Sequence, residues 1–391
     1  QLTMKNLTLL AFLFISCSIF AQDVNFFQGT WEEANAKAKA ENKLIMVDAF
    51  TYWCGPCKMM DKTFFHNNEA VATMINTHFI AYKVECEHDF GIQFARKFRV
   101  MAYPSLLFFN ADGQLLDRKM GFNADQDEFL SQLKSFVDMD QTAVCRFDAK
   151  NMQVPWPDFY INDFRDAADS AWKRNRNVDV NAWLDQQQDL FSEASWAVLA
   201  RFNTNEKYSQ YIVDNYATYS NLYKSEVNDK FNNILYNMVN RAAKESKPEL
   251  FNDAVKAMQT QKPNDTLNLF YMQSYYYELT GDWKNYAATV NARITNPANK
   301  VQLGEINSFA WTIYEKAEDE QIVKMAIGWF TPFLATINDY AAMDTYAALL
   351  SKAKQFNEAE EWAIKAIEIG KAENTDISGT EKLLESIRAS K

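Results

Sequence analysis

Two cysteines separated by two residues are the strongest candidates for covalent chemistry: Cys54 and Cys57 lie in the segment WCGPCK, residues 53–58. Their spacing allows a small disulfide ring. A buried-strand pattern over 44–50 precedes the segment, and a helical pattern begins within it. Free backbone N–H groups and the helix dipole stabilise a thiolate there and lower its pKa. We therefore expect Cys54 to be an exposed nucleophile and Cys57 to be the more buried resolving thiol.

Half of a zinc site is the alternative use of such a cysteine pair, but zinc needs two further ligands, usually from a second close pair. Cys86 and Cys145 each stand alone in the sequence, and the three histidines form no ligand pair: His66, His78 and His88. The pattern favours redox chemistry, and we expect neither a metal nor a soluble cofactor.

The elements that position the motif lie within residues 26–140, where helical and strand-like patterns alternate. Thr30 and Glu33 form a capping box for the first helix, and Asp112-Gly113 is a hairpin turn signal. The expected elements are a helix to about Asn42, strand 44–50, a helix from the motif, a helix capped by Asn67 or Asn68 and running to about Thr77, strand 79–85, helix 89–98, strands 105–110 and 114–120, and a helix from Asn123 to about Met139.

WCGPCK within this order of elements resembles the thioredoxin family, and matches outside the motif make the resemblance specific. In that family a buried acid lies six residues before the first cysteine, where Asp48 stands, and Lys83 matches a strand lysine near it. Tyr103-Pro104-Ser105 matches the family's cis-proline loop, and Gly121 fits a glycine late in the domain. The resemblance covers residues 26–140. More narrowly, these residues resemble exported thioredoxin-like proteins of the protein-disulfide reductase kind. It implies an α/β thioredoxin fold, with a central mixed sheet flanked by helices.

The resemblance implies that Asp48 and Lys83 assist the chemistry. Asp48, buried and desolvated, should have a raised pKa and accept a proton from Cys57 through water. Lys83 should tune Asp48 electrostatically.

The residues around the disulfide should bind substrate. Trp53 should shield the nucleophile, and Gly55 and Pro56 should set the turn between the cysteines; in the family, Gly-Pro there accompanies reducing activity. The backbone before Pro104 should pair with an extended substrate by strand addition. Tyr103 is bulkier than the usual residue before the cis-proline and should narrow the substrate groove.

The first 21 residues have the layout of a secretory signal peptide, and we expect cleavage after Ala21. Lys5 supplies the positive charge, and the apolar run 7–20 is shorter than the roughly 20 residues that span a membrane. Residues 1–3 precede Met4 and are expected to be extra. The sequence therefore predicts export, to the periplasm; lipid anchoring through Cys17 is the alternative.

Composition excludes several classes of protein. The chain of 391 residues has 10 Gly and 8 Pro, too few for collagen, flexible linkers or an all-β fold. Its net charge is −11 and it has no basic run, so we expect no nucleic-acid partner. With 48% hydrophobic residues it can bury a large core.

The remainder of the chain reads as helices. We expect a thioredoxin-like domain over 22–140, a connector over 141–159 and an all-helical domain over 160–391. Residues 343–368 carry small and apolar residues at spacings that resemble a tetratricopeptide (TPR) helix pair, and fainter echoes lie near 270–293 and 307–326. An irregular helical bundle is the alternative. Cys86 and Cys145 are either small buried hydrophobes or a structural disulfide.

These observations predict an exported thiol–disulfide oxidoreductase that reduces disulfide-containing protein substrates. The family resemblance implies a membrane-borne thiol–disulfide electron donor. Two alternatives remain: the helical domain binds a protein partner and the thioredoxin fold is accessory, or the enzyme works as a disulfide oxidase or isomerase.

Overall fold

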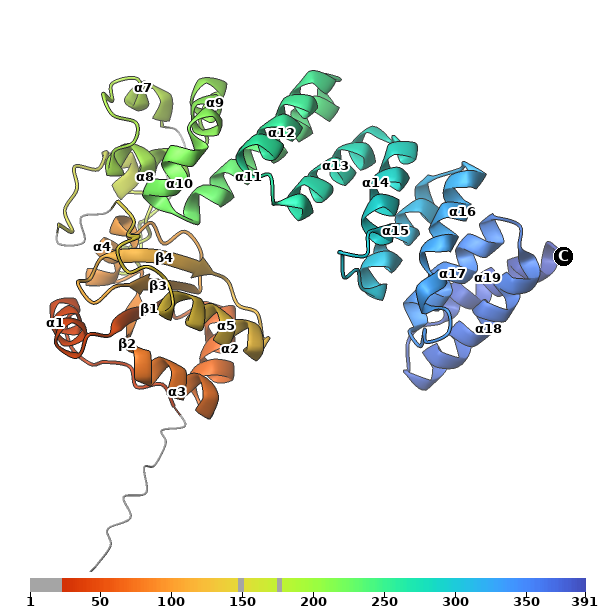
Figure 1. Ribbon diagram of the computed structural model, residues 1–391, viewed down its shortest axis with the longest axis horizontal. Coiled ribbons are helices and arrows are strands. Elements are labelled where there is room, and N and C mark those ends of the chain that lie inside the picture. Colours follow the sequence, from red (N-terminus) through yellow and green to blue (C-terminus); the bar gives the residue numbers. More distant parts are fainter. Residues whose placement is uncertain (1–22, 147–150, 174–177) are drawn as a thin grey trace, which may run out of the picture. The chain divides into compact units, whose positions relative to one another are not determined.

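The computed structural model describes residues 23–146, 151–173 and 178–391 (Figure 1). The predicted signal peptide and Cys17 lie outside the described residues. Within the described ranges, no helix is long and apolar enough to cross a membrane. The chain divides into two compact units, of which the first ends at Phe231 and the second begins at Asn232.

The first unit is built on a four-stranded mixed sheet with the order β2-β1-β3-β4. Strands β1 and β2 are parallel, whereas β3 pairs antiparallel with both β1 and β4. The strands are β1 (Leu44–Phe50), β2 (Phe79–Glu85), β3 (Ser105–Phe109) and β4 (Leu115–Met120). Their helices are α1 (Trp31–Glu41), α2 (Gly55–Met60) with the π-helical turn η1 (Asp61–Phe65), α3 (Glu69–His78), α4 (Asp89–Lys97) and α5 (Gln126–Val137). The predicted order of elements is confirmed.

Helices cover both faces of this sheet, which explains why its central strands β1 and β3 are nearly continuous apolar runs. On one face, Met46 of β1 packs in a cluster with Phe64 of η1, Ile75 of α3 and Phe129 of α5. On the other, the Trp31 ring of α1 packs edge-on against aromatic rings of α4 and β3. Because side chains alternate along a strand, Asp48 shares the face of Met46.

Local capping explains where the helices begin. Thr30 and Glu33 form the predicted capping box of α1, and Asn68 caps α3. The expectation that Asn123 begins the last helix of the domain is wrong. Asp125 is the cap of α5, because its carboxylate accepts the Glu128 N–H (2.9 Å), whereas Asn123 accepts the Asp125 N–H (3.1 Å) and shapes the preceding turn.

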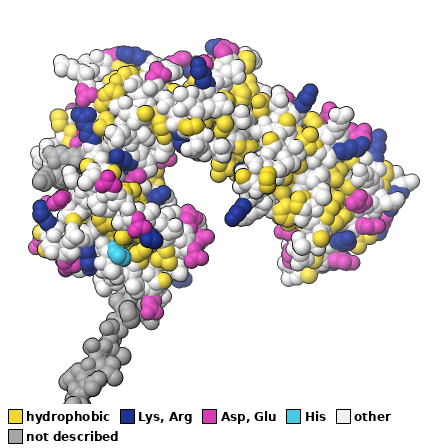
Figure 2. Space-filling view, viewed as in Figure 1, with side chains coloured by type: hydrophobic (Ala, Val, Ile, Leu, Met, Phe, Trp, Pro, Cys, Tyr) yellow, Lys and Arg dark blue, Asp and Glu magenta, His cyan; other side chains and the backbone are white. Residues whose placement is uncertain are grey.

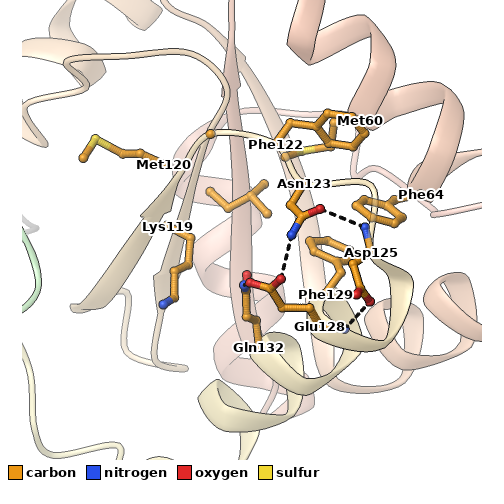
Figure 3. A pocket seen from close by; sticks show the side chains of 12 residues that line it. Met60, Phe64, Lys119, Met120, Phe122, Asn123, Asp125, Glu128, Phe129 and Gln132 are labelled. Atoms are coloured by element: carbon orange, nitrogen blue, oxygen red, sulfur yellow. Dashed lines mark hydrogen bonds between the residues drawn. The ribbon is translucent and has the colours of Figure 1, made fainter. Parts of the chain in front are cut away.

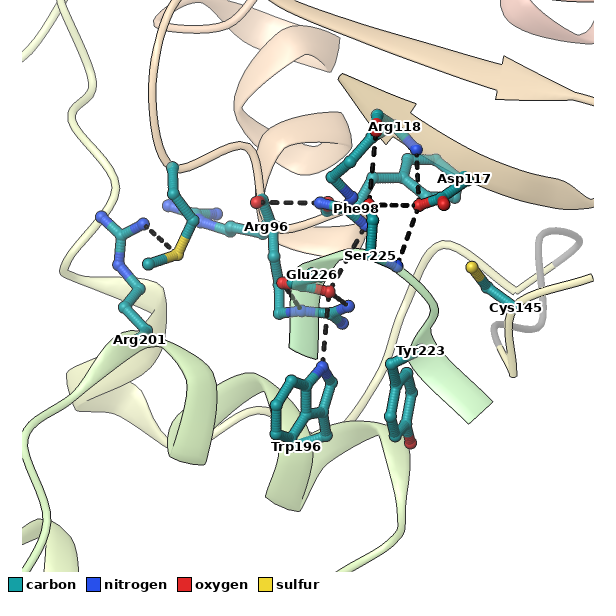
Figure 4. Close-up of polar contacts among 12 residues, drawn as sticks. Arg96, Phe98, Asp117, Arg118, Cys145, Trp196, Arg201, Tyr223, Ser225 and Glu226 are labelled. Atoms are coloured by element: carbon teal, nitrogen blue, oxygen red, sulfur yellow. Dashed lines mark hydrogen bonds and ion pairs between the residues drawn. The ribbon is translucent and has the colours of Figure 1, made fainter. Parts of the chain in front are cut away.

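The first unit also contains helices that follow the thioredoxin-like part: α6 (Asp158–Ile161), α7 (Val180–Leu184), α8 (Glu193–Arg201), α9 (Glu206–Asp214), α10 (Tyr216–Tyr223) and the start of α11 (Glu226–Lys244). Buried charges join them to the sheet domain (Figure 4). Glu226 accepts two hydrogen bonds from the Arg99 guanidinium, and Arg118 lies 3.6 Å from the same carboxylate. The Trp196 indole donates to it as well, at 3.3 Å. The helical region predicted from residue 160 is therefore shared between the two compact units.

The second unit is all helical in its described residues, as predicted. Besides most of α11 it holds α12 (Pro248–Gln261), α13 (Thr266–Thr280), α14 (Trp283–Thr295), α15 (Leu303–Lys316), α16 (Glu320–Trp329), the short 3-10 turn η2 (Thr331–Phe333), α17 (Tyr340–Lys352), α18 (Phe356–Ala372) and α19 (Ser378–Ala389). Ala347 of α17 and Ala359, Ala363 and Ala366 of α18 are fully buried in one cluster. Small residues thus let α17 and α18 pack closely; a TPR-like repeat stays a prediction.

The surface mixes charges of both signs. On the face shown in Figure 2, lysines and arginines stand among aspartates and glutamates, with hydrophobic side chains between them. This distribution agrees with a chain whose net charge of −11 is spread along the sequence.

Candidate active site: the Cys54–Cys57 disulfide

Cys54 and Cys57 form a disulfide at the N-terminus of α2, directly after β1. Cys54 is the N-cap residue, and its Sγ accepts the Cys57 N–H at 3.0 Å. Gly55 and Pro56 form the first turn of the helix, where the missing N–H of proline costs no helical hydrogen bond. The helix terminus therefore directs backbone N–H groups toward the Cys54 sulfur, as a stabilised thiolate requires.

The expected order of exposure of the two cysteines is wrong. Cys54 is 1% exposed and Cys57 is 8% exposed. In the oxidised pair Cys54 is the less exposed residue, and its Sγ is both bonded to Cys57 and the acceptor of the Cys57 N–H. The neighbouring side chains Tyr52 and Trp53 occupy the surface instead, at 67% and 60% exposed.

Asp48 lies on β1 and is buried. Lys83 is its register partner on β2, and Lys83 Nζ lies 3.3 Å from Asp48 Oδ2. Burial raises the pKa of Asp48 to about 6, although Lys83 opposes the rise. The burial and raised pKa that the resemblance implied for Asp48 are observed, while its role as proton acceptor remains a prediction.

The Lys83 ammonium pairs with two carboxylates. Besides Asp48 it pairs with Asp61 in η1, and its ammonium lies 4.7 Å from the centre of the Phe26 ring. The side chain is about one third exposed (32%). Lys83 lies beside Asp48 as predicted, while its role in tuning the Asp48 pKa remains a prediction.

The loop that faces the motif contains a cis peptide bond between Tyr103 and Pro104, as the resemblance implied. The Tyr103 ring packs edge-to-face on the Trp53 ring, with centroids 6.0 Å apart. Trp53 is thereby placed between the motif and this loop. Its indole Nε1 donates to Glu87 Oε2 at 2.9 Å.

Glu87 is a site residue that the sequence analysis missed. It is buried, accepts from Trp53, and lies 3.4 Å from Arg165 Nη1 in the helical part of the first unit. Its backbone carbonyl also accepts the Ala167 N–H at 2.8 Å. Nothing near Glu87 in the sequence signals a partner so far along the chain.

A second loop adjoins the cis-proline. Gly121 has a φ of +87°, which favours glycine, and its N–H donates to the Pro104 carbonyl at 2.9 Å. Beside it lies a hollow of about 250 Å³ with Met60 of α2 and Phe122 in its wall (Figure 3). The predicted late glycine thus links the end of β4 to the cis-proline loop.

Cys86 and Cys145 are free thiols, and both are buried. Burial raises the pKa of Cys86, and it raises that of Cys145 to about 12, so neither thiol supplies a thiolate at neutral pH. Their interpretation as small buried hydrophobes fits this structure, and the alternative disulfide between them is absent. Among the described residues, no group of three or more potential metal ligands occurs.

Residues 31–136 match a family model described as a thioredoxin-like domain. Thioredoxin H4 of Arabidopsis thaliana is 34% identical over 95 residues, which cover 74% of that protein and 24% of this chain. The chain belongs to the thioredoxin family. Residues 31–136 form its thioredoxin-like domain, and the Cys54–Cys57 disulfide lies at the CXXC motif of this domain.

Other relatives match the same part of the chain. The thiol:disulfide interchange protein DsbD of Pseudoalteromonas atlantica is 30% identical over 84 residues, 22% of this chain and 14% of that protein. DsbD of Yersinia pestis is 29% identical over 100 residues, 25% of this chain and 17% of that protein. The chain thus spans a small fraction of these curated relatives. A solved structure of a putative disulphide-isomerase from Bacteroides thetaiotaomicron is 37% identical and is covered to 98%, over 31% of this chain, with a TM-score of 0.28.

Proposed function

We propose that this protein is an exported thiol–disulfide oxidoreductase that reduces disulfides in other proteins. The observation that carries the proposal is the Cys54–Cys57 disulfide at a helix N-terminus, in a domain that also buries Asp48 beside Lys83. Its thioredoxin and DsbD relatives support the same chemistry. The electrons come from the two thiols, so the reaction needs no soluble cofactor.

The first step uses the reduced protein. The Cys54 thiolate, stabilised by the N-terminus of α2, attacks one sulfur of the substrate disulfide. A mixed disulfide forms between Cys54 and the substrate, and the other substrate sulfur leaves as a thiolate that takes up a proton.

The second step releases the substrate. Cys57 loses its proton to the Asp48 carboxylate through water, and the resulting thiolate attacks Cys54 Sγ. The mixed disulfide breaks, the second substrate thiolate leaves, and Cys54 and Cys57 become the observed disulfide. Two electrons have passed to the substrate. Lys83 favours the ionised form of Asp48 and so controls when the carboxylate accepts the proton.

The surface around the motif supports a protein substrate. In the described part of the first unit, five large hydrophobic side chains are exposed, and all adjoin the motif, the cis-proline loop or Gly121: Tyr52, Trp53, Met59, Met101 and Met120. Exposed aromatic and methionine side chains form adaptable contact surfaces for diverse partners. Such a surface suits an unfolded or extended polypeptide.

Export and the electron donor are parts of the same proposal. The signal-peptide pattern of residues 1–21 supports export to the periplasm. An exported reductase is oxidised in each turnover and needs a dithiol that can reduce it. We propose a membrane-borne thiol–disulfide donor for that step.

Cysteine variants test the proposal. With dithiothreitol as donor, the wild type should accelerate reduction of insulin, and Cys54→Ser should not. Cys57→Ser should accumulate a mixed disulfide with the substrate that dithiothreitol releases. Cys145→Ser is the matched control and should keep full activity. Catalysis by Cys54→Ser would contradict the mechanism.

We also propose that the second unit presents a protein-binding surface. Leu267, Tyr271 and Leu279 of α13 are exposed apolar side chains on one helix. Helix-pair repeats use such surfaces to dock proteins. In the Cys57→Ser background, Leu267→Glu with Leu279→Glu should reduce the amount of trapped protein. The same two substitutions in the protein that keeps both cysteines should leave reduction of a small disulfide unchanged. An unchanged trapped pool would contradict this role.

A further inference from the structure

A pocket of about 460 Å³ lies beside the motif, within the first unit. One wall belongs to the thioredoxin-like domain and includes Trp53, Met101 and Tyr103. The other belongs to the chain that follows it, with Phe164 and Trp172 in non-helical segments after α6 and Arg201 at the end of α8. Its volume falls in the range of about 300–1,000 Å³ that is usual for ligand sites.

The charged groups in this pocket are already paired. Arg201 binds the Asp163 carboxylate and donates to the Asp163 carbonyl at 3.1 Å. Arg165 lies 3.4 Å from Glu87, which in turn accepts from Trp53. Two cations and two anions therefore cancel, and a charged ligand would have to compete with these internal pairs.

Besides Cys86, Val100 and Ala102, the remaining lining consists of aromatic rings and the Met101 thioether. The Arg201 guanidinium lies 4.1 Å from the centre of the Phe164 ring and donates to the Met101 sulfur at 3.6 Å. Trp172 is fixed by its indole, which donates to the Asn162 carbonyl at 3.2 Å. Met101 is 42% exposed. Rigid aromatic faces opposite a flexible methionine suit a large apolar group.

The pocket is positioned to meet a substrate next to its reactive cysteine. Trp53 immediately precedes Cys54, its ring packs against the Tyr103 ring, and both side chains line the pocket. An extended substrate whose cysteine bonds to Cys54 must place a neighbouring residue at this opening.

We propose that this pocket binds a large apolar side chain, preferentially aromatic, adjacent to the reactive cysteine of an extended protein substrate. The wall formed by Phe164, Trp172 and Arg201, which lies outside the thioredoxin-like domain, then selects substrates that a thioredoxin-like domain alone would not distinguish. The placement of the bound side chain next to the reactive cysteine of the substrate rests on the proposed function, because it requires that cysteine to react with Cys54.

Binding without turnover tests the pocket directly. We would measure fluorescence anisotropy of labelled hexapeptides in which serine replaces the reactive cysteine, with the oxidised full-length protein. Peptides with Phe beside the serine should bind about tenfold tighter than those with Ala, as expected for partial burial of an aromatic ring. Peptides with Glu or Lys at that place should bind no tighter than the Ala peptide.

Substitutions in the pocket wall test whether the preference for Phe peptides arises there. Trp172→Ala should abolish the preference for Phe, and Met101→Ala, from the opposite wall, should weaken it if the first variant does not fold. Trp311→Ala removes an exposed tryptophan of the second unit and should keep the preference. Equal binding of Phe and Ala peptides to the wild type, or a preference that survives in both pocket variants, would overturn the proposal.

The same peptides with cysteine, as mixed disulfides with a small thiol, separate this proposal from the proposed function. Selective binding without any reduction of these disulfides would reject the redox function and keep the pocket. Reduction at one rate for Phe and Ala peptides, with equal affinities, would reject the pocket and keep the redox function.

Discussion

Lys83 Nζ lies 3.3 Å from Asp48 Oδ2, and the two residues are register partners on the parallel strands β2 and β1. The same ammonium pairs with Asp61. Asp48 Oδ1 is buried and makes no hydrogen bond among the described residues. Asp48 is therefore a poorly compensated carboxylate, which agrees with a pKa raised to about 6 by burial. The site keeps a proton acceptor near the disulfide at a cost in stability.

Asp48→Asn should stabilise the oxidised protein at pH 7. The folded carboxyl, with a pKa of about 6, binds its proton more tightly than the unfolded chain, with a pKa near 3.9. The contribution of the Asp48 carboxyl to the free energy of unfolding is therefore fully present below about pH 4, and it is lost as the pH rises through about 6. The substitution should raise the free energy of unfolding by about 2–3 kcal/mol at pH 7 and by little at pH 3.

Urea unfolding of the oxidised protein at both pH values measures this difference, since the bonded cysteines do not titrate. Asp112→Asn, at an exposed turn, is the control and should change neither value. A less stable Asp48→Asn protein at pH 7 would show that the carboxylate is well compensated. The variant should also resolve the mixed disulfide more slowly.

Lys83→Met should raise the pKa of Asp48 above its present value of about 6, because Lys83 favours the ionised carboxylate. Infrared difference spectra of the carboxyl stretch across a pH series report this pKa without requiring activity. The acidic limb of the pH profile for mixed-disulfide resolution should move upward with it. Lys39→Met removes an exposed lysine paired with Asp112 and should leave both unchanged. An unmoved Asp48 pKa in Lys83→Met would remove Lys83 from the mechanism.

Glu226→Ala should destabilise the first unit by about 3–5 kcal/mol, because it leaves the buried Arg99 and Arg118 without their shared carboxylate. At Glu226, burial would raise the pKa, but Arg118 and Arg99 together lower it, so the charge persists at neutral pH. Chemical unfolding followed by tryptophan fluorescence measures the change through Trp196.

Glu245→Ala, at an exposed pair with Arg241, is the matched control and should cost less than about 1 kcal/mol. The combined variant Arg99→Met with Glu226→Leu should recover only part of the loss, since it removes one of the two buried arginines that Glu226 compensates and leaves Arg118 without the carboxylate. A small effect of Glu226→Ala alone would mean that the helices α8 to α11 do not stabilise the sheet domain.

Gly91→Ala should prevent folding or destabilise the sheet domain severely. A Cβ on Gly91 of α4 would lie 1.6 Å from the backbone carbonyl oxygen of Glu85, at the end of β2, and backbone cannot move aside cheaply. Gly328→Ala, in α16, meets no atom within 4 Å and should be neutral or stabilising by up to about 1 kcal/mol. Circular dichroism melts compare the two, and a Gly91→Ala protein as stable as the wild type would mean that α4 does not pack this closely on β2.

Local signals in the sequence were enough to predict the core of the site. WCGPCK is read within one element, the family resemblance singles out Asp48 and Lys83, and parallel pairing of β1 with β2 then places Asp48 opposite Lys83. The order of helices and strands follows from apolar periodicity and caps in the same way. The cap at Asp125 was missed because Asn123 and Asp125 are both good capping residues, and only the turn decides between them.

Contacts between distant segments could not be predicted. Glu87 meets Arg165, and Arg99 meets Glu226, because the helices after the thioredoxin-like part pack on it, and no residue pattern encodes that packing. Exposure of Cys54 also depends on its surroundings and on its oxidation state. The position of Cys54 at a helix start predicts a reactive thiolate, whereas its exposure, lower than that of Cys57 in the disulfide, follows from tertiary packing.

The equilibrium reduction potential of the Cys54–Cys57 pair tests the central claim most directly. It is measured on the full-length protein by thiol alkylation across a graded dithiol buffer. A reductase should show one reversible two-electron transition near the potential of thioredoxin, about −270 mV. A potential near that of a strong periplasmic oxidant, about −120 mV, would make the protein a disulfide donor instead, and the absence of any reversible transition would contradict a redox function altogether.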